Sequence, residues 1–296
     1  MNAVDHNNVV IFDDRGIPSI MCRFARPKDA EEVPAVFKIG DKVADAIYIS
    51  KYPNIVIDGR AYSMPMADPT VNITFDEAVQ ACRCKGLGWH LMTAVEYEYL
   101  LNQSRGKGTM PHGNTDWGKD YYHKDEQGKV SNLGRTYTGT GPVTWNHDHT
   151  PYGVSDLNGN VWEWLAGLRI KDGVIEFIPD NKAASPYCDL SKDSTEWQQA
   201  ETSKGPVRAN VECGEITITD TVAADDYTPD YDRVRIDELE VVLSEVPQVL
   251  KDLGIIPDKR AEEEGKTYVY FDATEGEYLP FCGSAFYSAS NSGPSA

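Results

Sequence analysis

The hydrophobic and polar positions of residues 71–86 follow the period of an amphipathic helix. Thr74 and Glu77 stand three residues apart, the spacing of a capping box, in which each side chain accepts a hydrogen bond from the other residue's backbone amide. An apolar stripe follows at i, i+3, i+4 and i+7, made of Phe75, Ala78, Val79 and Cys82. Because glycine readily takes the left-handed conformation that ends helices, we expect this helix to stop at Gly86.

The stretch from Thr93 repeats the capping signal with Glu96 and predicts a second helix that ends before Gly106. After it, residues 104–150 are rich in glycine and aromatic residues and show no helical period. We interpret this region as a long ordered loop. Loops of this length are uncommon in compact domains and usually carry function.

Short apolar runs separated by turn residues predict a set of strands in the rest of the chain. The turn "DDRG" joins the first two runs as a hairpin, and Asp172-Gly173 marks the turn of another. One short helix is predicted over residues 246–257. The predicted strands are 9–12, 18–24, 44–53, the hairpin 166–180, the tract 207–220 and two runs within 266–287.

Composition and charge narrow the class of protein. The 296 residues are 41% hydrophobic and carry a formal net charge of −19, with no run of lysine or arginine. The acidic balance argues against nucleic acid or an anionic membrane as a partner, because both attract basic patches. No apolar run approaches the roughly 18 residues of a membrane span, so we expect no membrane insertion. The first residues lack the basic and apolar regions of a signal peptide, and we expect synthesis in the cytoplasm.

The cysteines show no pattern of a metal site. None has the spacing of zinc ligands, and Cys82 and Cys84 point apart if they lie on a helix. Without a secretion signal we expect reduced, mostly buried thiols. The six cysteines are Cys22, Cys82, Cys84, Cys188, Cys213 and Cys282.

Residues 156–165, "DLNGNVWEWL", place a polar turn directly before two tryptophans that flank a glutamate. Carboxylates from Asp156 and Glu163, together with backbone carbonyls of a tight turn, form the donor mix that calcium prefers. The alternative is a packed corner, in which Asn158 and Asn160 bond the backbone while the tryptophans pack. The residues alone leave both interpretations open.

The run "YGVSDLNGNVWEW" resembles the signature of the formylglycine-generating enzyme (sulfatase-modifying factor) family, a branch of the C-type lectin fold. Other segments are similar in the same order: "VNITFDEAVQAC" (71–82) to its first helix, "GWHLMTAVEYEYLL" (88–101) to its "RLPTEAEWEYA" helix, and "CGSAF" (282–286) to its "RGGSW". The resemblance is good over residues 44–180, weak over 278–296, and absent over 181–265. It implies an α+β C-type lectin fold with two main helices, short twisted sheets and much ordered loop.

In that family the equivalent turn binds calcium. Carried over residue by residue, the resemblance implies a structural calcium held by the side chains of Asp156 and Glu163 and by the carbonyls of Leu157, Gly159 and Val161. A second calcium site of the family uses an Asn-Ile pair followed by Asp-x-Phe. Asn132-Leu133 fits that pair, but Arg135 stands where the acid belongs, so we do not expect the second site.

The catalytic residues of the family are missing. Its enzymes oxidise a cysteine with copper held by two cysteines just after "RGGSW", since thiolates suit Cu(I). This chain has no cysteine after Gly283-Ser284, and Cys282 stands alone before them. The related iron-dependent sulfoxide synthases need a histidine cluster, but His147 and His149 in "NHDHT" are expected to point apart, and His6, His90, His112 and His123 are scattered. We therefore expect a protein that is not an enzyme.

A non-catalytic branch of the fold, the variable proteins of diversity-generating retroelements in phages and prophages, is similar to this chain at 110–122, 139–181 and the terminal "FCGSAFYSASNSG". Adenine mutagenesis of AAY codons in that branch excludes Lys, Glu, Gln, Met and Trp, and residues 282–296 contain none of them. Their Tyr, Ser and Asn suit adaptable binding, as in antibody loops. The plain alternative is a frayed terminus. A closing strand resembling "GFR", which the branch implies, is not found in these residues.

These resemblances imply a non-catalytic ligand- or receptor-binding display protein, diversified by a retroelement and encoded by a phage or prophage. Its binding face would comprise Ala285, Phe286, Tyr287, Ala289, Ser290 and Asn291. The expected partner is a protein or glycan on a target cell surface, met from a virion tail or cell surface after synthesis in the bacterial cytoplasm. The alternatives are a metal-dependent oxidase of the formylglycine-generating or sulfoxide-synthase type and a structural phage component.

The chain is divided by the same resemblance into two parts. Residues 1–43 form an N-terminal β-rich segment, and residues 44–296 form the lectin-like domain. That domain carries an insertion at about 181–265 and a variable segment at 282–296. A homo-oligomer is compatible with this division and is not specified by it.

Overall fold

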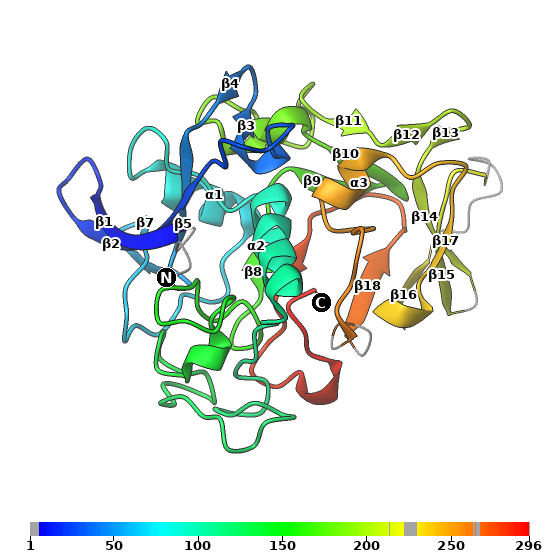
Figure 1. Ribbon diagram of the computed structural model, residues 1–296. Helices are drawn as coiled ribbons and strands as arrows, with labels where there is room; N and C mark the ends of the chain where they lie inside the picture. The colour runs from blue at the N-terminus through cyan, green and yellow to red at the C-terminus, as the bar shows by residue number, and fades with distance from the viewer. Residues whose placement is uncertain (1–5, 213, 222–229, 263, 265–266, 296) are drawn as a thin grey trace.

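The computed structural model describes residues 6–212, 214–221, 230–262, 264 and 267–295 (Figure 1). The chain opens with β1 (His6–Phe12) and β2 (Pro18–Ala25), which pair antiparallel, and β5 (Ala46–Ser50) completes a three-stranded sheet in the order β1-β2-β5. The predicted hairpin is confirmed. Its alternating apolar residues place Cys22 and Phe24 in the core.

Both predicted helices form, and both capping boxes are complete. They are α1 (Phe75–Arg83) and α2 (Ala94–Lys107). The predicted end of the second helix is wrong: α2 continues through Gly106 and ends at Gly108. Gly108 takes the left-handed conformation with φ 65°, and its amide donates to carbonyls of the last helical turn.

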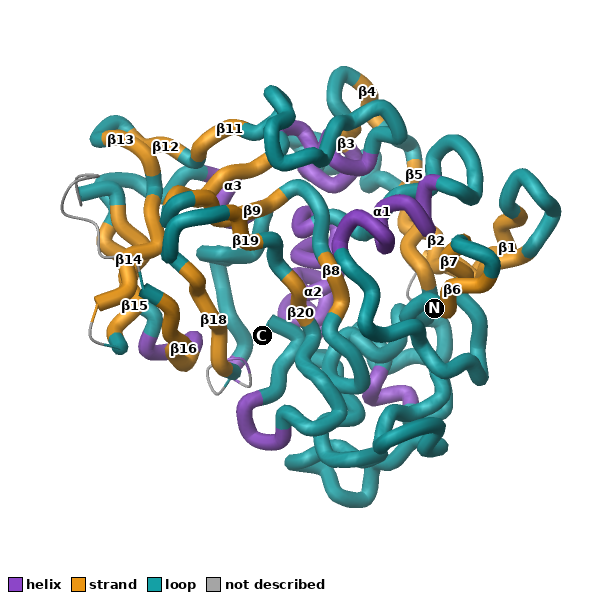
Figure 2. Tube along the Cα trace, turned by 180° about the vertical axis from the view of Figure 1, so that it is seen from behind, coloured by secondary structure: helices purple, strands orange, loops and turns teal. Residues whose placement is uncertain are grey.

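A seven-stranded sheet lies on the side of α2 away from the first sheet (Figures 1 and 2). The predicted hairpin at Asp172-Gly173 forms, and its two strands lie in the middle of this sheet. Both turn residues have positive φ, as a tight hairpin turn requires. Three strands from residues 208–242, where the sequence showed no family resemblance, extend the sheet beyond β10. The order is β17 (Glu240–Val242), β15 (Glu215–Thr219), β14 (Arg208–Glu212), β10 (Val174–Phe177), β9 (Leu168–Lys171) and β19 (Glu277–Tyr278), with β11 (Gln198–Gln199) also on β10.

Short two-stranded ladders complete the fold. One of them pairs β8 (Glu163–Trp164) with β20 (Phe281–Cys282) and so joins the tryptophan turn to the tail, which is defined here as residues 282–295. The other ladders are β3 (Lys38–Ile39) with β4 (Lys42–Val43), β6 (Ile55–Ile57) with β7 (Arg60–Tyr62), β12 (Glu201–Thr202) with β13 (Gly205–Pro206), and β16 (Tyr231–Arg235) with β18 (Tyr268–Asp272). A short helix, α3 (Gln248–Asp252), falls within the predicted 246–257.

The central helix α2 organises the core. Its buried Tyr97, Leu100 and Leu101 pack with Phe24 of the first sheet and with Leu157 of the tryptophan turn. The loop predicted over residues 104–150 extends instead over 108–162, because α2 includes residues 104–107. It contains a 3₁₀ turn at Val143–Trp145 and lies beside the tail at one end of the molecule (Figure 1). Among the described residues, no helix has the length and apolar character needed to cross a bilayer.

Candidate functional site

The polar turn before the tryptophans is fixed by its two asparagine side chains. Asn160 is fully buried, donates to the carbonyl of Thr136 at 3.1 Å and accepts from the amide of Thr136 at 2.8 Å. Asn158 donates to the carbonyl of Pro111 at 3.1 Å and accepts from the hydroxyl of Ser284 at 3.2 Å. The interpretation in which both asparagines bond the backbone is confirmed. They tie the long loop to the tail.

The two tryptophans pack as that interpretation expects. The indole of Trp164 donates to the carbonyl of Ile73 at 2.9 Å and meets the ring of Phe75 edge-on, with centroids 6.1 Å apart. Both tryptophans also contact Phe281, at 5.4 Å from Trp164 and 5.1 Å from Trp162. Edge-to-face aromatic pairs of this kind add stability beyond the area that they bury.

The two carboxylates predicted to bind calcium lie close enough to repel each other. Burial raises the pKa of Asp156 to about 6, against one weak hydrogen bond from the amide of Gly139 at 3.3 Å. Burial, and then the charge of Asp156, raises the pKa of Glu163 to about 8. The Glu163 carboxylate accepts no hydrogen bond from the described residues. A pair of acids in this state fits a bound cation, which would replace the missing donors.

The carbonyls of the predicted calcium set are partly engaged. The Leu157 carbonyl accepts from the hydroxyl of Tyr97 at 2.9 Å, and the Gly159 carbonyl accepts from the amide of Val161 at 2.9 Å. Each carbonyl oxygen has a second lone pair. The donor set therefore remains compatible with calcium, with Asp156 and Glu163 as its charged part.

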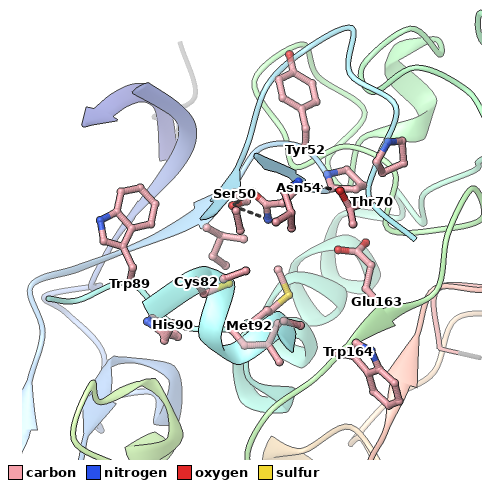
Figure 3. A pocket seen from close by; sticks show the side chains of 18 of the residues that line it. Ser50, Tyr52, Asn54, Thr70, Cys82, Trp89, His90, Met92, Glu163 and Trp164 are labelled. Atoms are coloured by element: carbon pink, nitrogen blue, oxygen red, sulfur yellow. Dashed lines mark hydrogen bonds between the residues drawn. The ribbon is translucent and has the colours of Figure 1, made fainter. Parts of the chain in front are cut away.

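Glu163 also lies on the wall of a cavity of about 160 Å³ (Figure 3). In Figure 3 its carboxylate faces the side chains of Thr70 and Met92 across this space. The cavity lies between the end of β5, α1 and the tryptophan turn, and its polar wall includes Ser50, Tyr52, Asn54, Thr70 and His90. A space of this size can hold several water molecules or a hydrated ion.

We did not expect the family's second calcium site in this chain, because Arg135 replaces its acid. In the structure, Arg135 forms an ion pair. The Arg135 guanidinium binds Asp68 with two hydrogen bonds, of 3.0 and 2.9 Å, and is buried. Leu133, of the pair that matched the family, is 72% exposed. The cation needed by Asp68 is therefore supplied by the protein itself.

Cys282 lies on β20, directly before the glycine of the segment that resembles the family's copper-site region. Burial raises the pKa of Cys282 to about 12, so this thiol keeps its proton at neutral pH. No other cysteine follows it in the sequence. Five cysteines are free, as expected, and Cys213 lies outside the described residues: Cys22 and Cys188 are buried, and Cys82, Cys84 and Cys282 are half-buried.

The histidines of "NHDHT" point apart, as expected. The ring of His147 is buried and its Nδ1 lies 2.9 Å from the amide of Val154, whereas His149 Nε2 lies 3.0 Å from the carbonyl of Met110. His149 instead approaches His112, with ring centroids 5.6 Å apart. The sequence did not indicate this meeting, because the intervening loop has no regular period.

The tail is ordered against the long loop, so the interpretation of a frayed terminus is wrong. The Phe286 amide donates to the Asn160 carbonyl at 3.2 Å, and the Phe286 carbonyl accepts from the Trp117 amide at 2.8 Å. The Ala289 amide donates to the Thr115 carbonyl at 2.9 Å. Figure 1 shows the tail, in red, folded back beside the green loop.

The predicted ligand-binding residues do not all reach the surface. Ala285 is only 3% exposed and therefore lies beneath the surface. Tyr287 is 58% exposed and Ser290 is exposed, whereas Phe286, Ala289 and Asn291 are half-buried.

Exposed apolar side chains of the long loop surround the tail. The Phe286 ring meets Trp117 edge-on with centroids 5.0 Å apart, and the Tyr122 hydroxyl donates to the Ser290 carbonyl at 3.3 Å. Trp117, Tyr122 and Leu133 are each more than half exposed. We call this surface the aromatic face; it consists of Trp117, Tyr122, Leu133, Phe286, Tyr287, Ser290 and Asn291.

One family of known proteins matches more than half of the chain. The family model described as FGE-sulfatase, the sulfatase-modifying factor enzyme 1-like domain, matches residues 52–205 of the 296. The match includes α1, α2, the long loop and the turn with both carboxylates, and it leaves the tail outside. No curated protein matches the chain.

Proposed function

The chain belongs to the sulfatase-modifying factor enzyme 1-like domain family, and from this premise we propose that it is a non-catalytic binding module with a C-type lectin fold. It binds a protein on a target cell surface through the aromatic face. The module is diversified by a retroelement and is displayed on a phage tail or cell surface. The absence of a cysteine pair from residues 283–296, where the family's enzymes hold copper, supports a non-catalytic role.

The aromatic face is the observation that carries this proposal. Monomeric proteins seldom expose contiguous apolar patches, and large aromatic side chains dominate the energy of interfaces. Here Trp117 and Tyr287 are both more than half exposed, and they lie on either side of Phe286, whose ring contacts both. Leu133 adjoins this surface, since the next residue, Gly134, lies against Trp117 and Phe286, and its exposed aliphatic side chain suits a protein partner.

The diversification is tested by comparing the gene with its siblings in related genomes. We expect the differences to concentrate at adenine positions of codons 286–291, with the codons of buried Ala285 and Asn160 unchanged, because changes there would disturb the support of the face. A template repeat and a reverse-transcriptase gene should lie nearby. Differences spread evenly over surface codons would refute diversification.

We propose further that Asp156 and Glu163 hold a structural calcium ion. Replacing Glu163 by glutamine is then expected to raise the free energy of unfolding at pH 8, in chelated buffer, by about 1–3 kcal/mol. The folded pKa values of about 8 and about 6 exceed the ordinary carboxyl values, so the folded state holds more protons than the unfolded state. Stability therefore falls as the pH rises from about 4 to 8. Urea unfolding at pH 5 and pH 8 measures the difference, which should nearly vanish at pH 5.

Calcium distinguishes an ion site from a mere pair of buried acids. Millimolar calcium should raise the melting temperature of the parent protein at pH 8 and leave that of Glu163→Gln unchanged. The control is Glu31→Gln, which removes one exposed acid and should keep the parent's response. If neither calcium nor chelator moves the parent's melting temperature, the corner is packing alone.

A further inference from the structure

Three side chains of the long loop meet at the edge of a second cavity. Nδ1 of His112 lies 3.0 Å from both carboxylate oxygens of Glu126, and the rings of His112 and His123 stack with centroids 3.7 Å apart. One ligand atom from each of the three residues can be chosen so that all lie within 4.8 Å of one another. Two imidazoles and a carboxylate are the donors that zinc accepts in open, three-ligand sites.

Outer contacts orient two of these side chains. Asp120 Oδ1 lies 3.0 Å from Nδ1 of His123, which engages that nitrogen and leaves Nε2 for another partner. The indole of Trp145 donates to Glu126 at 3.0 Å. Carboxylates behind metal-binding histidines commonly fix the ring in this way and raise its basicity.

The cluster faces open space on one side. His112 and His123 line a cavity of about 300 Å³ together with His149, whereas Glu126 does not, so it lies behind them. Ser292 and Pro294 of the tail also line this cavity. An ion bound by the three side chains would therefore have its remaining coordination positions toward the cavity.

A small rearrangement brings the donors together. Zinc ligands lie about 2.0–2.2 Å from the ion, so neighbouring ligand atoms are separated by roughly 3.5 Å. The parallel rings must tilt so that their nitrogens point to one ion. The side chain of His123 is 46% exposed, which leaves it room to turn.

We propose that His112, His123 and Glu126 bind a divalent transition metal of the zinc class, with at least one coordination position open to the cavity. Calcium is disfavoured here, because two of the three donors are imidazoles. The open position takes water or an oxygen ligand such as a carboxylate. This site is separate from the proposed calcium pair and does not depend on the aromatic face.

Zinc titration of the tag-free, chelator-treated full chain tests the proposal. Calorimetry should show one equivalent of zinc bound at neutral pH, and His123→Ala should weaken the affinity at least 100-fold. The control is His6→Ala, which removes an imidazole from β1 and should bind zinc like the parent. Because His123 is nearly half exposed, its replacement should leave the melting temperature of the metal-free protein unchanged.

Cobalt reports the open position. The cobalt-loaded parent should show visible absorption bands that shift when acetate is added, since acetate can occupy a free coordination position. Equal zinc affinity in the parent and His123→Ala would overturn the site. Bands that acetate does not move would overturn the open position.

Discussion

Replacing Gly159 by alanine is expected to lower the free energy of unfolding by about 3–5 kcal/mol, because two separate costs add at this position. Gly159 has φ 76°, a conformation that side chains with a Cβ rarely adopt. An added Cβ would also lie 2.2 Å from the Asn114 carbonyl oxygen, which belongs to the backbone and cannot swing away. Urea unfolding followed by tryptophan fluorescence measures the loss.

Gly106→Ala is the matched control for that substitution. Gly106 lies within α2, and an added Cβ there meets nothing within 4 Å. Alanine favours the helix, so this variant should gain about 0.5–1 kcal/mol. If Gly159→Ala proved as stable as Gly106→Ala, Gly159 could not lie as close to the backbone of Asn114 as it does in the structure.

The parts of the fold that depend on local sequence signals could be predicted from the sequence. Capping boxes and hairpin turns are local signals, and both helices and the Asp172-Gly173 hairpin were predicted correctly. The end of α2 was predicted before Gly106, whereas the helix continues to Lys107 and is capped by Gly108. The family match over 52–205 confirms most of the resemblance predicted over 44–180 and also includes residues 181–205, where no resemblance was found in the sequence.

The sites depended on contacts that sequence spacing does not encode. Asn160 meets Thr136 across 24 residues of loop without regular structure, and His112 meets Glu126 in the same way. The joining of 208–219 to the central sheet was missed because an open strand edge accepts any suitable partner. A search for histidines and acids within one loop would have found His112, His123 and Glu126.

Replacing Arg105 by methionine is expected to lower the free energy of unfolding at pH 8 by about 3–5 kcal/mol. The Arg105 guanidinium lies between Glu98, at 2.5 Å, and Glu264, at 2.8 Å. The side chains of both acids are at most 3% exposed, so methionine would leave two buried carboxylates without the guanidinium that binds them both. Lower pH should reduce the loss, since the carboxyls can then take up protons. Urea unfolding at pH 5 and pH 8 measures both effects.

Arg26→Met supplies the control, because the partner of Arg26 is Asp45, whose side chain is 95% exposed. Exposed pairs of this kind contribute up to about 1 kcal/mol, so this variant should unfold almost like the parent. The buried cluster also reaches the tail, since the Ser295 hydroxyl donates to Glu264 at 2.6 Å. Arg105→Met should therefore speed hydrogen exchange in residues 289–295, and adding Glu98→Gln and Glu264→Gln should recover much of the lost stability. A variant as stable as the parent at pH 8 would show that Arg105 does not hold Glu264, and the tail with it, against α2.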